Sequence, residues 1–190
     1  RSALNITQEI ENVGGSMNAY TSREITSYHM HVLQDNVPLA LDVLSDMVQN
    51  SVMPDEEVER ERHVILQEIG MCHDTPDDLI FDNYYETAYE GQALGAPILG
   101  KPDIIGSMRR DTMMEYVSSF YTPSRMVVSA AGNLDHEDFV AHVRQCFATL
   151  PEDKGYNSAD PDYTGGESLY SKPLEQSHIV LGFEGVGRTD

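Results

Sequence analysis

Apolar residues recur along this chain with two periods, one typical of strands and one typical of helices. Residues 25–33 (ITSYHMHVL) are rich in β-branched and aromatic side chains and alternate with a period near two, which predicts a strand. Residues 16–21 (SMNAYT) predict a shorter strand just before it. The intervening residues 22–24 can connect the two as a hairpin turn. Two further apolar runs, at residues 126–131 and 178–183, also predict strands.

Helical spacing of apolar residues accounts for most of the remaining chain. The start and stop signals are local: Gly14-Gly15 ends the first predicted helix, and Pro54 followed by acidic residues begins another, with its acids at the positive end of the helix dipole. The predicted helices cover residues 4–13, 35–47, 54–71, 76–89, 109–120 and 135–150.

Gly and Pro residues predict an irregular loop over residues 91–106, and polar residues predict a long loop over 151–172. The predicted helices are thus mixed with strands along the chain, and the hairpin near residues 16–33 indicates that at least part of the sheet is antiparallel. We therefore predict an α+β fold with a mixed or antiparallel sheet packed against helices.

The composition narrows the classes of partner. The chain has 190 residues with 40% apolar and 23% charged side chains, a globular balance, and no apolar run is long enough to span a membrane. The net charge of −20 disfavours nucleic acid, because phosphate binding needs a basic surface. A basic substrate is favoured electrostatically, although such a charge can also serve solubility alone. The two cysteines, Cys72 and Cys146, show no ligand spacing and indicate reduced thiols.

The segment at residues 56–69 (EEVERERHVILQEI) carries the most informative pattern. Glu61 and Glu68 are seven residues apart, nearly two helical turns, so both carboxylates lie on one helix face with Val64 and Ile65 between them. This face suits a helix that directs carboxylates toward a polar site. The spacing alone favours the alternative, a charged amphipathic helix whose glutamates pair with arginines, because runs of charge are usually solvated helix faces.

Several segments in order resemble the M16 (pitrilysin) peptidases, in particular the β subunit of mitochondrial processing peptidase and its bacterial relatives. The similar segments are IENVGGSMNAYTSREITSYH, ERERHVILQEI, PDDLIFDNYYETAYEGQALGAPILG and YTPSRMVVSAAGNLDHEDFV. The resemblance implies a zinc peptidase in which two histidines of an HxxEH motif and a later glutamate hold the metal, and in which the glutamate of the motif is the general base. By motif, Glu68 corresponds to the third zinc ligand and Glu61 to a supporting acid beside the site.

The chain contains no HxxEH. None of its seven histidines begins that motif, and His136-Glu137 does not form HExxH. The resemblance places the motif upstream of Arg1, so we expect a truncated chain that binds zinc weakly or not at all by itself. His29 and His31 share a strand face and could bind metal, but without a third ligand a structural pair is the simpler interpretation.

The resemblance also indicates where a peptide would bind. Asn18, Ala19 and Tyr20 correspond to the family's exposed edge strand, which an extended substrate joins through backbone pairing. Asp78 and Asp82, four apart on a predicted helix, correspond to acids that receive an arginine near the cleaved bond. From the residues alone, an ordinary core hairpin and a solvated pair of aspartates would explain the same patterns.

The resemblance further implies that residues 1–190 form most of one N-terminal αβ domain, without the C-terminal half of the family's chain. Residues 1–105 would be the catalytic part without its HxxEH segment, and residues 106–190 the second part. The expected function is zinc-dependent hydrolysis of peptides or presequences with basic residues, with one Zn²⁺ per intact site. A second M16 half or subunit would complete a homodimeric or heterodimeric clamshell, in a bacterial cytoplasm or a mitochondrial matrix.

Two alternatives remain open. The chain could come from a structural subunit that resembles the core proteins of the respiratory bc1 complex, whose zinc sites are degenerate. The presence of both Glu61 and Glu68 argues against that class. It could also be a peptidase fragment that acts only as a partner to another chain. An intact HxxEH upstream of Arg1 would favour the enzyme.

Overall fold

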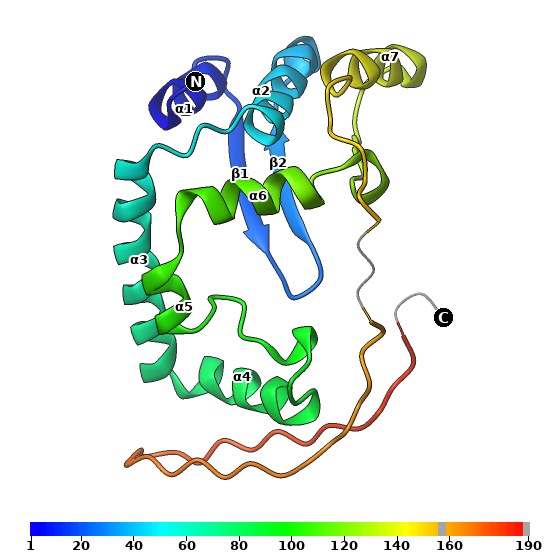
Figure 1. The fold of residues 1–190 in the computed structure, drawn as a ribbon. Helices are drawn as coiled ribbons and strands as arrows, with labels where there is room; N and C mark the ends of the chain where they lie inside the picture. Colours follow the sequence, from blue (N-terminus) through cyan, green and yellow to red (C-terminus); the bar gives the residue numbers. More distant parts are fainter. Residues whose placement is uncertain (156–158, 188–190) are drawn as a thin grey trace. The chain divides into compact units, whose positions relative to one another are not determined.

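The computed structural model describes residues 1–155 and 159–187 (Figure 1). These residues form two structural units, and the chain passes between the units several times. The first unit contains residues 1–21, 25–54 and 109–155; the second contains residues 22–24, 55–108 and 159–187. Each unit is therefore built from segments that are far apart in the sequence.

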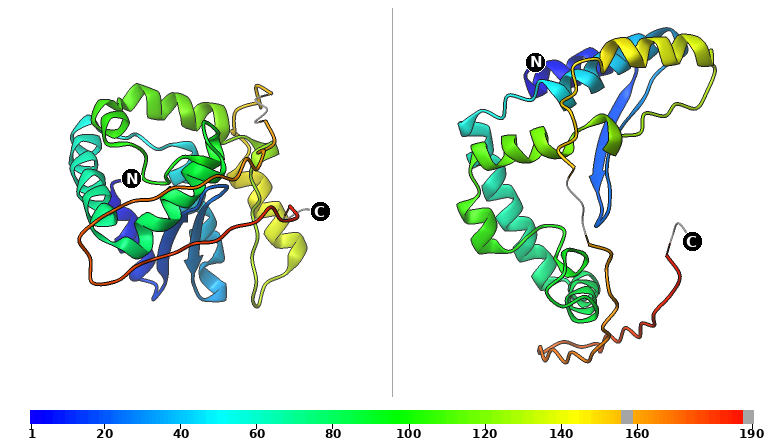
Figure 2. Two further views of the ribbon diagram at one scale, coloured as in Figure 1. Left: turned by 90° about the horizontal axis from the view of Figure 1, so that it is seen from below. Right: turned by 45° about the vertical axis from the view of Figure 1, so that its right-hand side comes forward.

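The first unit combines a hairpin with four α-helices. Its antiparallel strands β1 and β2 pair from Ser16 with His31 to Thr21 with Thr26, as the alternation predicted. The elements are α1 (Ala3–Glu11), β1 (Ser16–Thr21), β2 (Thr26–His31), η1 (Gln34–Asn36), α2 (Val37–Gln49), α6 (Arg110–Phe120), η3 (Pro123–Arg125) and α7 (His136–Cys146). Figure 2 shows α1, α2 and α7 side by side at one end of the hairpin.

Local signals explain how the first helix begins and ends. The Ser2 hydroxyl accepts a hydrogen bond from the Asn5 N–H at 3.2 Å and caps α1. Gly14 ends the helix with φ of +73°, a conformation that glycine adopts without strain. A Cβ at Gly15 would lie only 2.9 Å from side-chain atoms of Ile10 and Val32, so this position must be small for α1 to pack onto the hairpin.

Helix α2 supplies the core of the first unit. Ala40, Leu41, Val43 and Val48 are buried on this helix. The Gln49 side chain at its end donates to the Cys146 carbonyl at 2.8 Å and accepts from the Thr149 hydroxyl at 2.9 Å. These contacts join the end of α2 to the end of α7, across almost one hundred residues of sequence.

The second unit is helical and is bordered by an extended segment. Its elements are α3 (Asp55–Asp74), α4 (Pro76–Ala88), η2 (Ala93–Gly95) and α5 (Pro102–Ser107). Helix α3 packs against α4 and α5. Arg62 of α3 donates to the carbonyls of Ile105 and, at 2.6 Å, of Met108, and so satisfies acceptors at the C-terminal end of α5.

Residues 159–187 extend along the second unit without regular secondary structure (Figure 2). The side chain of Gln92 holds this segment by donating to the Asp162 carbonyl and accepting from the Asp162 N–H, both at 2.7 Å. The Thr164 N–H donates to the Ala88 carbonyl at the end of α4 at 3.0 Å. Farther along, the Tyr163 hydroxyl donates to the Gly182 carbonyl.

The α+β class is confirmed, but several predicted elements need correction. Residues 126–131 and 178–183 are not strands, and every second side chain or more in them is exposed, with 93% for Val127 and 81% for Ile179. The physical reason is that a strand needs a neighbour, and within the described residues β1 and β2 pair only with each other. The region predicted as a loop over 91–106 contains η2 and most of α5, and the last helix ends at Cys146 instead of residue 150.

The described residues also include no helix with both the length and the apolar character that crossing a membrane requires.

Candidate active site on helices α3 and α4

The two glutamates singled out on α3 are both exposed and unpaired. Glu61 and Glu68 make no hydrogen bond or ion pair with any described residue. The neighbouring arginines instead use other acids: Arg60 binds Glu57 at 2.6 Å and Arg62 binds Glu59 at 3.0 Å. The arrangement in which the arginines neutralise Glu61 and Glu68 is therefore not the one adopted, and both carboxylates remain available.

The apolar middle of this helix face is only partly covered. Val64 is 40% exposed and Ile65 is half-buried, whereas Ile69 on the adjoining face is buried. The face therefore combines free carboxylates with accessible apolar surface.

A zinc ion needs more donors than this part of the chain provides. A catalytic zinc has about three protein ligands and one open position. Among residues 1–155 and 159–187, no group of three or more His, Cys, Asp or Glu side chains could hold a metal ion. The carboxylate of Glu68 is chemically suited to be one ligand. The described residues alone, however, do not fit a complete zinc site.

His29 and His31 lie close together on β2. Their rings are 6.1 Å apart in an edge-on arrangement, and the ring of Tyr20 lies 6.2 Å from that of His29. Aromatic contacts of this kind give the pair a packing role on the hairpin.

The candidate peptide-binding strand is open along one edge. β1 pairs with β2 on one side and has no strand on the other among the described residues. Asn18, Ala19 and Tyr20 are exposed there. The Asn18 side chain accepts a hydrogen bond from the Ala19 N–H at 2.8 Å, so one backbone donor of this segment is already satisfied locally.

The two aspartates on α4 have different surroundings. Asp78 is exposed and its carboxylate has no partner among the described residues. Asp82 is paired with Arg23, whose Nη2 lies 2.6 Å from the carboxylate. The Cys72 thiol lies 3.8 Å from the other oxygen of Asp82. Burial raises the pKa of Cys72 above its ordinary value, and the negative charges of Asp82 and Asp78 raise that pKa further, which keeps the thiol protonated.

Arg23 is the residue of this region that the sequence reasoning missed. It lies in the turn between β1 and β2, 59 positions before its partner. No local pattern links a turn residue to an acid on a helix so far along the chain. The available signal was the residue type alone, since a guanidinium favours pairing with carboxylates.

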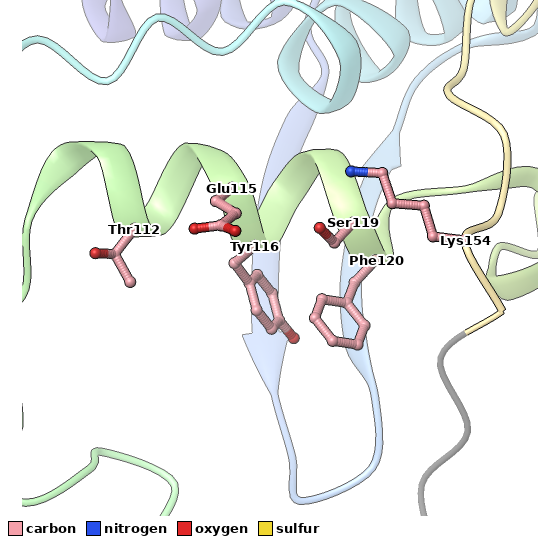
Figure 3. A pocket seen from close by; sticks show the side chains of 6 residues that line it. All are labelled: Thr112, Glu115, Tyr116, Ser119, Phe120 and Lys154. Atoms are coloured by element: carbon pink, nitrogen blue, oxygen red, sulfur yellow. The ribbon is translucent and has the colours of Figure 1, made fainter.

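A hollow lies on the first unit along α6 (Figure 3). It has a volume of 460 Å³ and is lined by Thr112, Glu115, Tyr116, Ser119, Phe120 and Lys154. The rings of Tyr116 and Phe120 are 4.7 Å apart. With one carboxylate and one ammonium group in its lining, the hollow has no set of groups suited to hold a metal.

Comparison with known proteins gives a consistent result along the whole chain. Residues 1–102 match the family described as Insulinase (Peptidase family M16), and residues 107–190 match the Peptidase M16 inactive domain. A protein of Rickettsia felis named as an uncharacterized zinc protease is 39% identical over 186 residues, which cover 98% of this chain and 45% of that protein. A probable mitochondrial-processing peptidase subunit beta of Arabidopsis thaliana is 38% identical over 196 residues, covering all of this chain and 37% of that protein.

The fold comparison agrees. The crystal structure of a protease from Helicobacter pylori matches 87% of this chain and 40% of its own chain, with a TM-score of 0.78 and 19% identity. At that identity the match shows a shared fold. The chain spans less than half the length of the curated relatives it matches.

Proposed function

This chain belongs to peptidase family M16, and from this premise we propose that it forms part of a zinc-dependent endopeptidase of the processing-peptidase type. Relatives named as zinc proteases and as a processing-peptidase subunit support the proposal. The activity is proposed for the full-length protein, because the chain spans less than half of those relatives. Within it, residues 1–190 would form most of the first αβ domain.

The observation that carries the proposal is the state of the α3 carboxylates. Glu61 and Glu68 lie on one helix face without a partner among the described residues, although Arg60 and Arg62 stand on the same helix. An unpaired carboxylate is an available oxygen ligand for zinc. We assign Glu68 as a zinc ligand and Glu61 as an acid that supports the site from beside it. The remaining ligands would come from an HxxEH segment, so this chain alone does not complete a hydrolytic site.

The substrate would be an extended peptide with basic residues. The open edge of β1 at Asn18, Ala19 and Tyr20 offers backbone groups that can pair with any sequence. Asp78 and Asp82 would supply negative charge for a basic side chain. A second M16 half or subunit would complete the enclosure, in a bacterial cytoplasm or a mitochondrial matrix according to the source organism.

Replacing Glu68 with Gln in the full-length protein tests the metal assignment. The amide keeps the shape of the side chain but is a much weaker zinc ligand. The zinc affinity and the rate of peptide hydrolysis should therefore each fall by roughly 100-fold or more. Glu61→Gln should lower the same two quantities by roughly 10-fold to 100-fold, as expected for a residue that supports a ligand. Zinc is measured by metal analysis after dialysis against a metal buffer.

The matched control is Glu56→Gln, on the same helix and highly exposed. It should retain zinc and activity. If Glu68→Gln binds as much zinc as Glu56→Gln, Glu68 is not a ligand and the proposed site is wrong.

A further inference from the structure

The hollow beside α6 is lined mainly by one face of that helix (Figure 3). Side chains three and four positions apart share a helix face, and this spacing connects Thr112, Glu115, Tyr116, Ser119 and Phe120. Lys154 completes the lining from a later part of the chain. The volume of 460 Å³ falls within the range of binding sites for small molecules.

Two aromatic rings give the hollow an apolar platform. The ring centres of Tyr116 and Phe120 are 4.7 Å apart, and the ring planes are inclined by 30°. The ring of Tyr121 supports that of Tyr116 edge-on at 6.5 Å. The guanidinium of Arg125 lies 5.7 Å from the centre of the Phe120 ring. Tyr116 is nevertheless 56% exposed, so its ring can still stack against the ring of a ligand.

Lys154 extends toward this platform from a turn that is fixed at its base. The Asp153 carboxylate accepts a hydrogen bond from the Ser124 hydroxyl and lies 3.4 Å from Nε of Arg125. The same carboxylate accepts from the Gly155 N–H at 2.9 Å, which closes the turn around Lys154. The lysine side chain points from this turn toward α6 (Figure 3).

The two charged groups of the lining are both available to a ligand. Neither Glu115 nor Lys154 forms an ion pair or a side-chain hydrogen bond with any described residue. They do not pair with each other either, although both line the same hollow. The lining therefore presents a carboxylate and an ammonium group beside an aromatic surface.

We propose that this hollow binds a zwitterionic aromatic amino acid, such as phenylalanine. The ring of the ligand stacks on Tyr116 and Phe120. Its ammonium group pairs with Glu115, and its carboxylate pairs with Lys154. The inference does not depend on the proposed peptidase function, because no residue of this lining is assigned to zinc or to the peptide substrate.

Other classes of small ligand match the lining less well. A simple aromatic cation meets the positive charge of Lys154, and a simple aromatic anion meets the negative charge of Glu115. A neutral ring leaves both charged groups without a partner. An aliphatic amino acid satisfies the charges but loses the stacking on the two rings.

The test measures dissociation constants of four probes for the full-length protein by ligand-observed NMR. Phenylalanine carries all three groups, phenethylamine lacks the carboxylate, 3-phenylpropanoate lacks the ammonium group, and leucine lacks the ring. Because the hollow is open and its charges are solvated, phenylalanine should bind with a dissociation constant of about 1 mM. Each of the other three probes should bind roughly fivefold more weakly.

Two substitutions should each act through one group of the ligand. Lys154→Gln should weaken the binding of phenylalanine roughly fivefold without weakening that of phenethylamine, which has no carboxylate to lose a partner. Glu115→Gln should weaken phenylalanine to a similar extent without weakening 3-phenylpropanoate. The matched controls are Glu137→Gln and Arg144→Gln, which remove exposed charges of either sign from α7 and should leave all four dissociation constants unchanged.

The inference is wrong if phenylalanine does not bind at concentrations up to about 30 mM, well above the expected dissociation constant. It is equally wrong if leucine binds as tightly as phenylalanine, or if each lining variant weakens all four probes alike. Thermal unfolding checks that the variants fold, and if one does not, the four probes on the unchanged protein decide. A full-length protein that cleaves no peptide would contradict the proposed function and leave this test intact, because binding is measured without turnover.

Discussion

Arg60 and Arg62 show why neighbouring charges on a helix do not all pair. Each arginine binds an acid three residues earlier, Glu57 and Glu59 respectively. Positions three apart share a face, whereas Glu61 is adjacent to both arginines in sequence and points elsewhere. Helical geometry therefore predicts from the sequence which acids are neutralised.

The environment of Asp82 could not be predicted in the same way. Its partner Arg23 is 59 positions away, and only the folded arrangement of the second unit brings the two together. The resemblance identified the aspartate and left its partner undetermined. Candidate site residues were thus predictable where a resemblance or a helical spacing marked them, and their pairing was predictable only within a helix.

Arg1 and Asp46 provide a prediction on pH dependence. Arg1 lies 3.0 Å from Asp46, and this hydrogen bond lowers the pKa of Asp46 from its ordinary value of 3.8, with a smaller contribution from Asn50. A carboxyl whose pKa is lower in the folded state stabilises the fold above its unfolded pKa, and the stabilisation is lost as the pH falls through the folded pKa. Arg1→Gln should therefore lower the free energy of unfolding at neutral pH, and the difference from the unchanged protein should shrink below about pH 4.

Urea denaturation at several pH values measures this difference. Arg144→Gln removes a positive charge on an exposed side chain that forms no ion pair with the described residues, and it should show no such convergence. If the difference in the free energy of unfolding between Arg1→Gln and the unchanged protein stays constant down to about pH 2, the effect of Arg1 does not depend on ionised carboxylates.

At the scale of elements, the helices were predictable because their signals are local. Prolines, acidic first turns and apolar spacing identified α2, α3, α4 and α6 within a few residues. The apolar runs at 126–131 and 178–183 were assigned as strands on composition, but strand formation depends on a partner that no local pattern supplies. The hairpin was predictable because its partner is the next segment of the chain.

Gly95 at the end of η2 gives a prediction about packing between elements. A Cβ added there would lie 2.3 Å from the backbone oxygen of Tyr89 and 3.1 Å from that of Tyr85. Gly95→Ala should therefore push η2 away from the end of α4 and lower the free energy of unfolding by about 1–3 kcal/mol. Gly106→Ala is the matched control, because nothing lies within 4 Å of its added Cβ and alanine favours the helix α5.

The two glycine variants should thus move the free energy of unfolding in opposite directions, Gly106→Ala raising it by up to about 1 kcal/mol. Thermal or urea unfolding provides the measurement. Equal stability of the two variants would mean that η2 does not pack against α4 as closely as described.

At the scale of the whole molecule, the net charge of −20 should assist the capture of basic peptides. The screening length of the solution falls from ~30 Å at 0.01 M salt to ~8 Å at 0.15 M. Over this range kcat/KM for an arginine-rich peptide should fall roughly tenfold in the full-length protein, as expected when long-range attraction is screened.

A neutral peptide of the same length is the control and should show little change. If both peptides respond equally to salt, the acidic surface serves solubility and does not attract the substrate.

The interleaved path of the chain has a consequence for synthesis on the ribosome. Helix α2 of the first unit ends at Gln49, yet its partner on α7, Cys146, is translated nearly one hundred residues later. The residues of α3, α4 and α5 emerge in between. The side of α2 that packs against α7 must therefore remain uncovered while those helices appear, and a nascent chain stalled before α7 would be a natural target for chaperones.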